Sequence, residues 1–145
     1  MEKIIINNIA QIIPHRNPML MIDFYKRIDK GNALSEKTFQ KNDYGCENGI
    51  VIDSILIECV AQTVAAHNGY QSMMENKKDV GMGMLVSVDR FDFYHPVLEN
   101  SKIDIFITQT DRIGAFKLVK GEIRMEDKLM ATGTIKIFNP EKEDV

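Results

Sequence analysis

The stretch Ser54-Ile-Leu-Ile-Glu-Cys-Val-Ala-Gln-Thr-Val-Ala-Ala-His67 decides the fold. Written as a helix, it is apolar on nearly every side, and a helix of this kind lies in a protein core. Its polar residues Ser54, Glu58 and Gln62 are spaced i, i+4, i+8 and therefore share one face. A carboxylate there must find a partner or shift its pKa upward, and the upward shift makes a Glu useful as an acid at neutral pH. The alternative is a structural Glu58 at a helix surface or a dimer seam.

Length and charge exclude several classes of protein. The chain has 145 residues, 44% hydrophobic and 27% charged, which is enough for one core, so we expect a single domain over residues 1–145. The formal net charge of −3 gives no general attraction to nucleic acid or anionic lipid, although a local basic patch for an acidic carrier protein is compatible with it. Glu58 and Gln62 interrupt the longest apolar run before it could span a bilayer, and the N-terminus lacks a signal pattern. We expect a cytoplasmic protein.

The cysteines and histidines do not predict a metal site or a disulfide framework. Cys46 and Cys59 match no zinc spacing, and we expect both to be reduced thiols. No cluster of His, Cys or carboxylate residues has ligand spacing. The sequence therefore predicts no metal ion and no organic cofactor.

The hydrophobic periodicity predicts two helices and an antiparallel sheet. A short helix is expected over residues 4–13, and the long helix should begin with Asp53 or Ser54 as its N-cap and reach about Met74. Strands are expected at residues 19–28, 33–39, 83–97, 102–110, 115–125 and 129–138. The first two should form a hairpin through a turn at 29–32, and the last four should form a meander. Residues 41–49 are expected to be a polar, Gly-rich loop.

An antiparallel sheet of about six strands around one long central helix is an α+β arrangement, the hotdog fold. The helix must be buried, because the sheet has only one face with which to cover it. Such a sheet has an open edge, which pairing with a second copy would hide. We therefore expect a homodimer or an assembly of dimers.

Three blocks of the sequence resemble the 3-hydroxyacyl-[acyl-carrier-protein] dehydratases. Pro14-His-Arg-Asn-Pro-Met-Leu-Met-Ile-Asp23 is similar to their PHR-x-P-(hydrophobic)3-D stretch. Ile57-Glu-Cys-Val-Ala-Gln62 is similar to their E-x-x-A-Q helix, and Arg90-Phe-Asp-Phe-Tyr-His-Pro-Val97 to the strand with an F-x-x-P-V element. The blocks occur in the family's order and extend over nearly the whole chain.

The resemblance implies dehydration of 3-hydroxyacyl thioesters to 2-enoyl thioesters, in fatty-acid or polyene-type biosynthesis. It implies a substrate carried on the phosphopantetheine of acyl carrier protein or coenzyme A, bound in a tunnel at a dimer interface. In the family, a His of one protomer and a carboxylate on the partner's helix share removal of the α-proton and protonation of the departing hydroxyl. Glu58 corresponds to that carboxylate, and the amides of Asp53 and Ser54 correspond to the oxyanion site. We expect Gln62 to hold Glu58 by a hydrogen bond.

The chain departs from the family at the GHFPG element, which is absent. Tyr44 occupies the position of its His, and Asp53 replaces the Gly that offers an oxyanion amide. This pattern resembles the divergent branch associated with aryl-polyene clusters, which keeps PH-x-x-P-M and the helix Glu. His15 is the first candidate for the missing base, and the alternative is a structural role in hydrogen-bonding its loop. Tyr44 could donate a hydrogen bond to the substrate hydroxyl. His95 is a second candidate that could line the same cavity.

The remaining polar residues have weaker claims. His67 lies nine positions after Glu58, about 180° away on the helix, and is expected outside the site. Arg16 has a docking or a structural role. Two other functions fit the same residues: a hotdog acyl thioesterase, and a catalytically silent protein that binds acyl carrier or completes a heterodimer with an active dehydratase.

Overall fold

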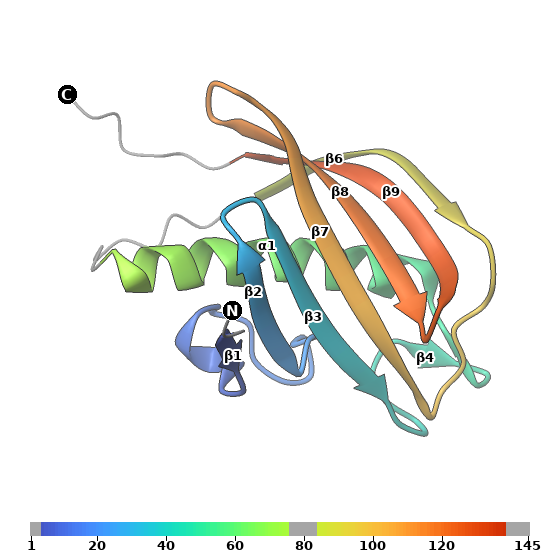
Figure 1. Cartoon of the computed structure of the whole chain (residues 1–145). Coiled ribbons are helices and arrows are strands. Elements are labelled where there is room, and N and C mark those ends of the chain that lie inside the picture. The colour runs from blue at the N-terminus through green and yellow to red at the C-terminus, as the bar shows by residue number, and fades with distance from the viewer. Residues whose placement is uncertain (1–3, 76–83, 139–145) are drawn as a thin grey trace.

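One long helix lies across the inner face of a twisted antiparallel sheet (Figure 1). The computed structural model describes residues 4–75 and 84–138. The elements, in chain order, are β1 (Ile4–Ile6), η1 (Ile9–Gln11), β2 (Phe24–Asp29), β3 (Asn32–Phe39), β4 (Cys46–Glu47), β5 (Ile50–Val51), α1 (Asp53–Met74), β6 (Met84–Phe93), β7 (Ser101–Ile113), β8 (Phe116–Met125) and β9 (Lys128–Phe138). The strand order in the described sheet is β1-β2-β3-β7-β8-β9-β6, and β4 and β5 form a separate hairpin. The hotdog arrangement predicted from the sequence is confirmed.

The core lies between α1 and the inner face of the sheet. Its apolar side chains come from one face of each strand and from most of the helix circumference, so burial removes apolar surface from water on both sides of the contact. Core members on α1 and β7 include Leu56, Cys59, Val60, Val64, Ala66, Tyr70, Ile103, Ile105 and Ile107. Gly121 in β8 allows the helix to approach closely, because a Cβ there would lie 2.5 Å from Val60.

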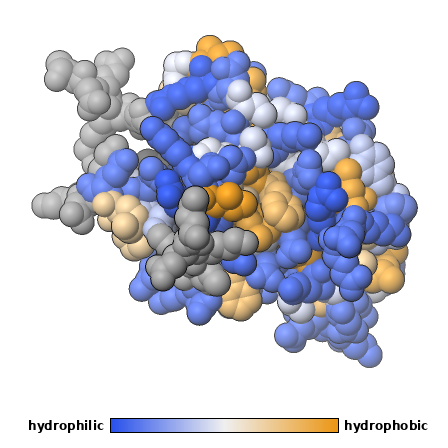
Figure 2. Space-filling model, in the orientation of Figure 1, coloured by the Kyte–Doolittle hydropathy of each residue, from blue (hydrophilic) through white to orange (hydrophobic). Residues whose placement is uncertain are grey.

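The opposite face of the sheet is polar, as expected for an antiparallel sheet with one solvated face. In β7, Asp104 and Phe106 alternate with the three buried isoleucines. Figure 2, in the orientation of Figure 1, is mainly hydrophilic and shows apolar side chains in separate places. No helix within residues 4–75 and 84–138 has the length and hydropathy to span a membrane.

The helix bounds agree with the prediction at one end and differ slightly at the other. The helix ends at Met74 as expected, but its N-cap is Ile52, which offers no side-chain cap. Asp53 and Ser54 therefore lie within the first turn and do not cap it. An acidic Asp53 in this turn still faces the positive end of the helix dipole.

The predicted helix over residues 4–13 is wrong. Residues 4–6 form strand β1, which pairs with β2 in the register Ile4↔Arg27, and only the short turn η1 follows it. Three consecutive isoleucines favour a strand, since branching at Cβ restricts their rotamers in a helix. The strand expected to begin at residue 19 begins only at Phe24, because the preceding residues form a loop bound to α1.

The predicted four-strand meander is correct only in part. β7, β8 and β9 are consecutive neighbours joined by tight turns, with Gly114 and Glu126 at positive φ. β6, however, pairs with β9 at the far edge of the sheet and not with β7. The chain leaves β3, passes through α1 across the sheet and returns on the opposite edge. The expected loop over residues 41–49 also contains β4 of the short hairpin.

A buried polar contact links the C-terminal half of α1 to the β2–β3 hairpin. Nε2 of His67 must donate to the Lys30 carbonyl at 2.7 Å, because a carbonyl only accepts. Nδ1 then accepts from the Tyr25 hydroxyl at 2.6 Å. The neutral imidazole satisfies both partners, and burial, with Arg27 and Lys117 adding to it, holds the pKa of His67 below its ordinary value.

We expect the alanine substitution Gly69→Ala to destabilise the fold by at least about 2 kcal/mol, because a Cβ there would lie 1.8 Å from the Ile12 carbonyl oxygen and overpack the contact. The midpoint of urea unfolding measures this change. Gly31→Ala is the matched control, since its Cβ meets no atom within 4 Å and should change stability by less than about 0.5 kcal/mol. Equal midpoints for the two variants would contradict the packing.

We expect the free energy of unfolding to fall as the pH drops below the ordinary histidine pKa of 6.5. A folded-state pKa below the unfolded value means that the unfolded chain binds more protons, so the stabilisation is complete above pH 6.5 and is lost toward the lower folded pKa. One proton contributes a slope of at most about 1.4 kcal/mol per pH unit. Urea titrations of the wild type and His67→Gln between pH 8 and 5 should differ in slope. Parallel curves would show that His67 does not titrate as argued.

Candidate active site

A single amide, the side chain of Gln62, holds the loop between η1 and β2 against α1. Its Oε1 accepts from the Met21 N–H at 2.7 Å, and its Nε2 donates to the Met19 carbonyl at 2.8 Å. The same Nε2 donates to Oε2 of Glu58 at 2.7 Å, the contact expected from their i, i+4 spacing. Gln62 is 1% exposed, and these bonds use both N–H groups of Nε2 and one of the two acceptor positions of Oε1.

Arg16 holds the other end of the loop. Its Nη1 donates to the carbonyls of Ile13 at 2.9 Å and His15 at 2.8 Å, and its Nη2 donates to Ala10 at 3.4 Å. The guanidinium thereby fixes the backbone on both sides of Pro14. Arg16 is expected from the sequence to have a docking or a structural role, and these hydrogen bonds support the structural role.

This doubly held loop brings His15 to Glu58. The two side chains approach with Nε2 of His15 3.9 Å from Oε2 of Glu58, and they are 29% and 35% exposed. The separation exceeds a hydrogen bond and leaves both groups open to a ligand. Both residues come from one chain, whereas the resemblance implies a His and a carboxylate from different protomers. The family His in that arrangement stands at the position of Tyr44 in this chain and not at the position of His15.

Tyr44 lines a cavity beside the loop, and Glu58 is not among the lining residues. The cavity measures about 310 Å³ and is lined by Asn17, Pro18, Leu20, Met21, Lys37, Asp43 and Tyr44. The phenol is exposed, and no hydrogen bond among the described residues joins it to Glu58. Lys37 was missed by sequence reasoning. It faces inward from β3, pairs with Asp23 at 3.6 Å and lies over the Phe39 ring. The alternation of β3 was its only signal, since Lys37 shares a face with Phe39.

The other predicted site residues lie at the ends of elements. Asp53 and Ser54 form the first turn of α1, one turn before Glu58, where backbone N–H groups lack partners within the helix. His95 follows β6 and is exposed. Its N–H donates to Met130, and no hydrogen bond or ion pair in the described structure joins its imidazole to Glu58. His67 belongs to the packing contact with Tyr25, away from Glu58.

The environment of both cysteines opposes formation of the thiolate. Both thiols are free, and burial raises the pKa of Cys46 and, more strongly, of Cys59. Within residues 4–75 and 84–138, no group of three His, Cys, Asp or Glu side chains is placed to hold a metal ion.

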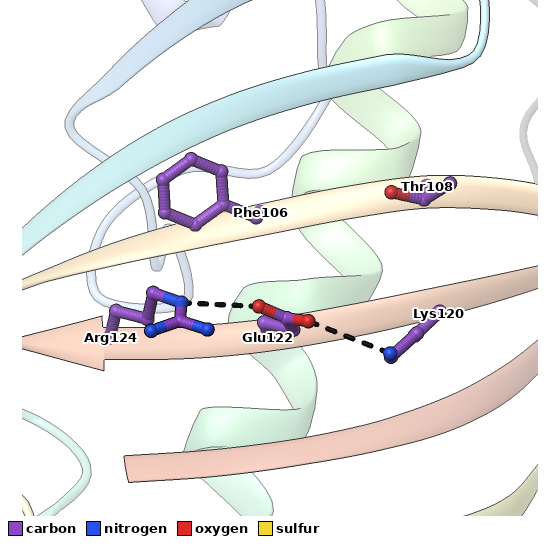
Figure 3. Close-up of a pocket in the computed structure, with 5 residues that line it drawn as sticks. All are labelled: Phe106, Thr108, Lys120, Glu122 and Arg124. Carbon is purple, nitrogen blue, oxygen red and sulfur yellow. Dashed lines mark hydrogen bonds and ion pairs between the residues drawn. The ribbon is translucent and has the colours of Figure 1, made fainter. Parts of the chain in front are cut away.

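A second hollow, of about 280 Å³, lies on the outer face of the sheet (Figure 3). Its charged side chains pair with one another: Glu122 accepts from Arg124 at 3.1 Å and lies 3.6 Å from Lys120. Since the sheet separates this hollow from α1, it does not belong to the site around Glu58.

Comparison with known proteins identifies the family. The model of the ApeP-like family, described as ApeP dehydratase, matches residues 7–145. A 3-hydroxyacyl-[acyl-carrier-protein] dehydratase FabZ from Sinorhizobium fredii is 24% identical over 147 residues, covering 96% of this chain and 92% of the relative. The FabZ of Streptococcus pneumoniae serotype 4 is 26% identical, covering 90% of this chain and 94% of the relative.

Among solved structures, the dehydratase heterocomplex ApeI:P from Xenorhabdus doucetiae matches with a TM-score of 0.82 at 19% identity, covering 92% of this chain and 91% of that one. Cj0977 from Campylobacter jejuni, a sigma28-regulated virulence protein, matches with a TM-score of 0.70 at 16% identity, covering 94% and 98%. These likenesses show the fold, and the family model shows the relationship. The chain belongs to the ApeP-like dehydratase family.

Proposed function

We propose that this protein removes water from 3-hydroxyacyl thioesters carried on acyl carrier protein and forms 2-enoyl thioesters. The observation that carries the proposal is the placement of His15 Nε2 3.9 Å from Glu58 Oε2 on a doubly held loop. Elimination of water needs one group at the α-carbon and one at the hydroxyl of the next carbon. Two hydrogen-bonding side chains at this spacing, at least one of them able to transfer a proton, can reach both positions of a single substrate.

The geometry of a bound hydroxyl supports the proposal. An oxygen about 2.8 Å from both Nε2 and Oε2 would see the two atoms at an angle of about 90°, which a hydroxyl accommodates. Such an oxygen can accept from the imidazole and donate to the carboxylate at once. The substrate's 3-hydroxyl is the group that fits this position.

The N-terminus of α1 supports the other half of the reaction. Removing the α-proton places negative charge on the thioester oxygen, and preorganised N–H donors lower the energy of that charge. The amides of Asp53 and Ser54 lie one turn before Glu58, at the positive end of the helix dipole. Glu58 and the proposed oxyanion site thus lie on one helix, and His15 faces Glu58 from the loop. Phosphopantetheine bearing the acyl group is the only prosthetic group in this proposal.

A second candidate is a partner subunit in a mixed assembly of dehydratase-fold chains. Two observations favour it: Tyr44 stands where the family has its His, and a structural neighbour is a dehydratase heterocomplex. The two proposed functions differ in whether this chain, without a second kind of chain, catalyses removal and addition of water. The His15–Glu58 pair favours activity of its own.

We expect the purified protein to interconvert 3-hydroxyacyl and enoyl thioesters of acyl carrier protein, and Glu58→Gln to lower the rate by about 10³-fold, in the range that acid–base groups contribute. Mass spectrometry of the carrier measures loss and gain of water, and a thiol assay detects hydrolysis. Glu75→Gln, at the end of α1, is the matched control. Thiol release without water exchange would indicate a thioesterase, and inertness would indicate the partner role.

The proposed assembly is a homodimer that pairs through β6. This strand hydrogen-bonds to β9 on one side and has no described neighbour on the other. Consecutive residues Leu85 and Val86 are both exposed, as are Val88 and Phe93, so apolar side chains reach solvent on both faces of an edge strand. A long apolar edge of this kind is stabilised when a second strand covers it.

We expect the double substitution Val86→Lys and Val88→Lys to convert the dimer into monomers, because edge lysines oppose strand pairing. Light scattering after gel filtration measures the mass. Ile113→Lys, at the exposed end of β7, should leave the dimer intact. The proposal fails if the β6 variant remains dimeric while folded.

A further inference from the structure

We propose that His15 acts as a hydrogen-bond donor through Nε2–H, and that Glu58 is the group that takes and returns the proton. This inference rests on the proposed dehydration and assigns the roles within it. It reverses the sequence-based expectation that His15 supplies the base. The observation behind it is the unequal environment of the two imidazole nitrogens.

Nδ1 of His15 is buried and has no hydrogen-bond partner among the described residues. Nε2, in contrast, lies at the partly exposed side that faces Glu58. A neutral imidazole carries one proton, and burying an unpaired N–H costs more than burying an unpaired lone pair. The burial therefore favours the tautomer with the proton on Nε2. In this tautomer the nitrogen that faces the substrate is already protonated and cannot accept the α-proton.

The two oxygens of Glu58 are also unequal. Oε2 accepts from Gln62 at 2.7 Å and faces His15. No hydrogen bond from the described part of the chain reaches Oε1. One oxygen thus fixes the carboxylate, and the other is free to accept a proton from carbon. The carboxylate is held on a helix by a buried amide, which positions a proton-transfer group better than a loop does.

The proton balance closes with Glu58 alone. Its Oε1 takes the α-proton as the Cα–H bond breaks, and the electron pair moves toward the thioester carbonyl. The pair then forms the Cα–Cβ double bond, and the C–O bond at C3 breaks with its electrons on oxygen. Glu58 returns the proton to that oxygen, and water leaves. His15 donates through Nε2–H to the departing oxygen throughout and ends each turnover unchanged.

The other titratable side chains near the loop do not replace Glu58 in this role. Lys37 is paired with Asp23, and Asp43 accepts from the Gln40 N–H at 2.8 Å. Tyr44 lines a cavity with Lys37 and Asp43, and Glu58 is not one of its lining residues. Within the described structure, Glu58 is the one carboxylate within 4 Å of the His15 imidazole.

The tautomer is tested directly by nitrogen NMR of the imidazoles in the wild-type protein, which is independent of any substrate. The chain has three histidines, so His15→Ala identifies the His15 signals. His67 is an internal reference, because its hydrogen bonds require the Nε2–H form. We expect His15 at neutral pH to show an unprotonated Nδ1 and a protonated Nε2. A proton on Nδ1 would overturn the proposal.

The roles are tested by rates of water addition to an enoyl thioester. Glutamine offers an N–H close to the position of Nε2 but cannot take up a proton at neutral pH. We expect His15→Gln to stay within about tenfold of the wild type, His15→Ala to lose about 100-fold, as for a removed oxyanion donor, and Glu58→Gln to lose about 10³-fold.

The outcomes distinguish failure of the role assignment for His15 and Glu58 from failure of the proposed dehydration. Equal losses for His15→Gln and His15→Ala, in variants with unchanged urea midpoints, would show that His15 is the base and overturn the role assignment while the dehydration stands. A wild type without water exchange would overturn the dehydration and the role assignment together.

Discussion

The buried amide of Gln62 is the interaction on which the site depends. It satisfies the Met21 N–H, the Met19 carbonyl and Oε2 of Glu58 together. Removing it would leave a buried N–H without an acceptor, at a cost of about 1–3 kcal/mol, and would release the loop that carries His15. Stability and the relative position of His15 and Glu58 therefore depend on the same side chain. Arg16 completes the loop's attachment through carbonyl oxygens alone.

The surrounding fold provides a rigid base for this amide. α1 is fixed on one side by close packing at Gly121 and on another by the approach of Ile12 to Gly69. The His67–Tyr25 contact ties its C-terminal half to the β2–β3 hairpin. Since the helix is held at several points, Glu58 and Gln62 have a fixed relation to the loop, and the 3.9 Å separation from His15 follows from that relation.

The parts of the structure that follow from local chemistry could be predicted from the sequence. The apolar circumference predicts the central helix, and the i, i+4 spacing predicts the Gln62–Glu58 bond. Features that depend on distant partners could not be predicted. β1 forms because β2 is available to pair with it, and β6 lies at the far edge because the helix carries the chain across the sheet. The segment from Met19 resembles a strand by composition, and it lies outside the sheet where Gln62, 41 positions after Met21, hydrogen-bonds to it. The inward position of Lys37 also could not be predicted from local sequence, because it depends on how β3 is placed in the sheet.

The central claim is that one chain holds both His15 and Glu58 of a working site. The most direct test co-expresses a His15→Ala chain and a Glu58→Gln chain with different tags, purifies the mixed species through both tags and measures water addition to an enoyl thioester. A pair within one chain is broken in both subunits, so the mixed species should be no more active than the His15→Ala variant, the less impaired of the two. Recovery of about half the wild-type rate would mean that the pair forms between chains, and would contradict the account.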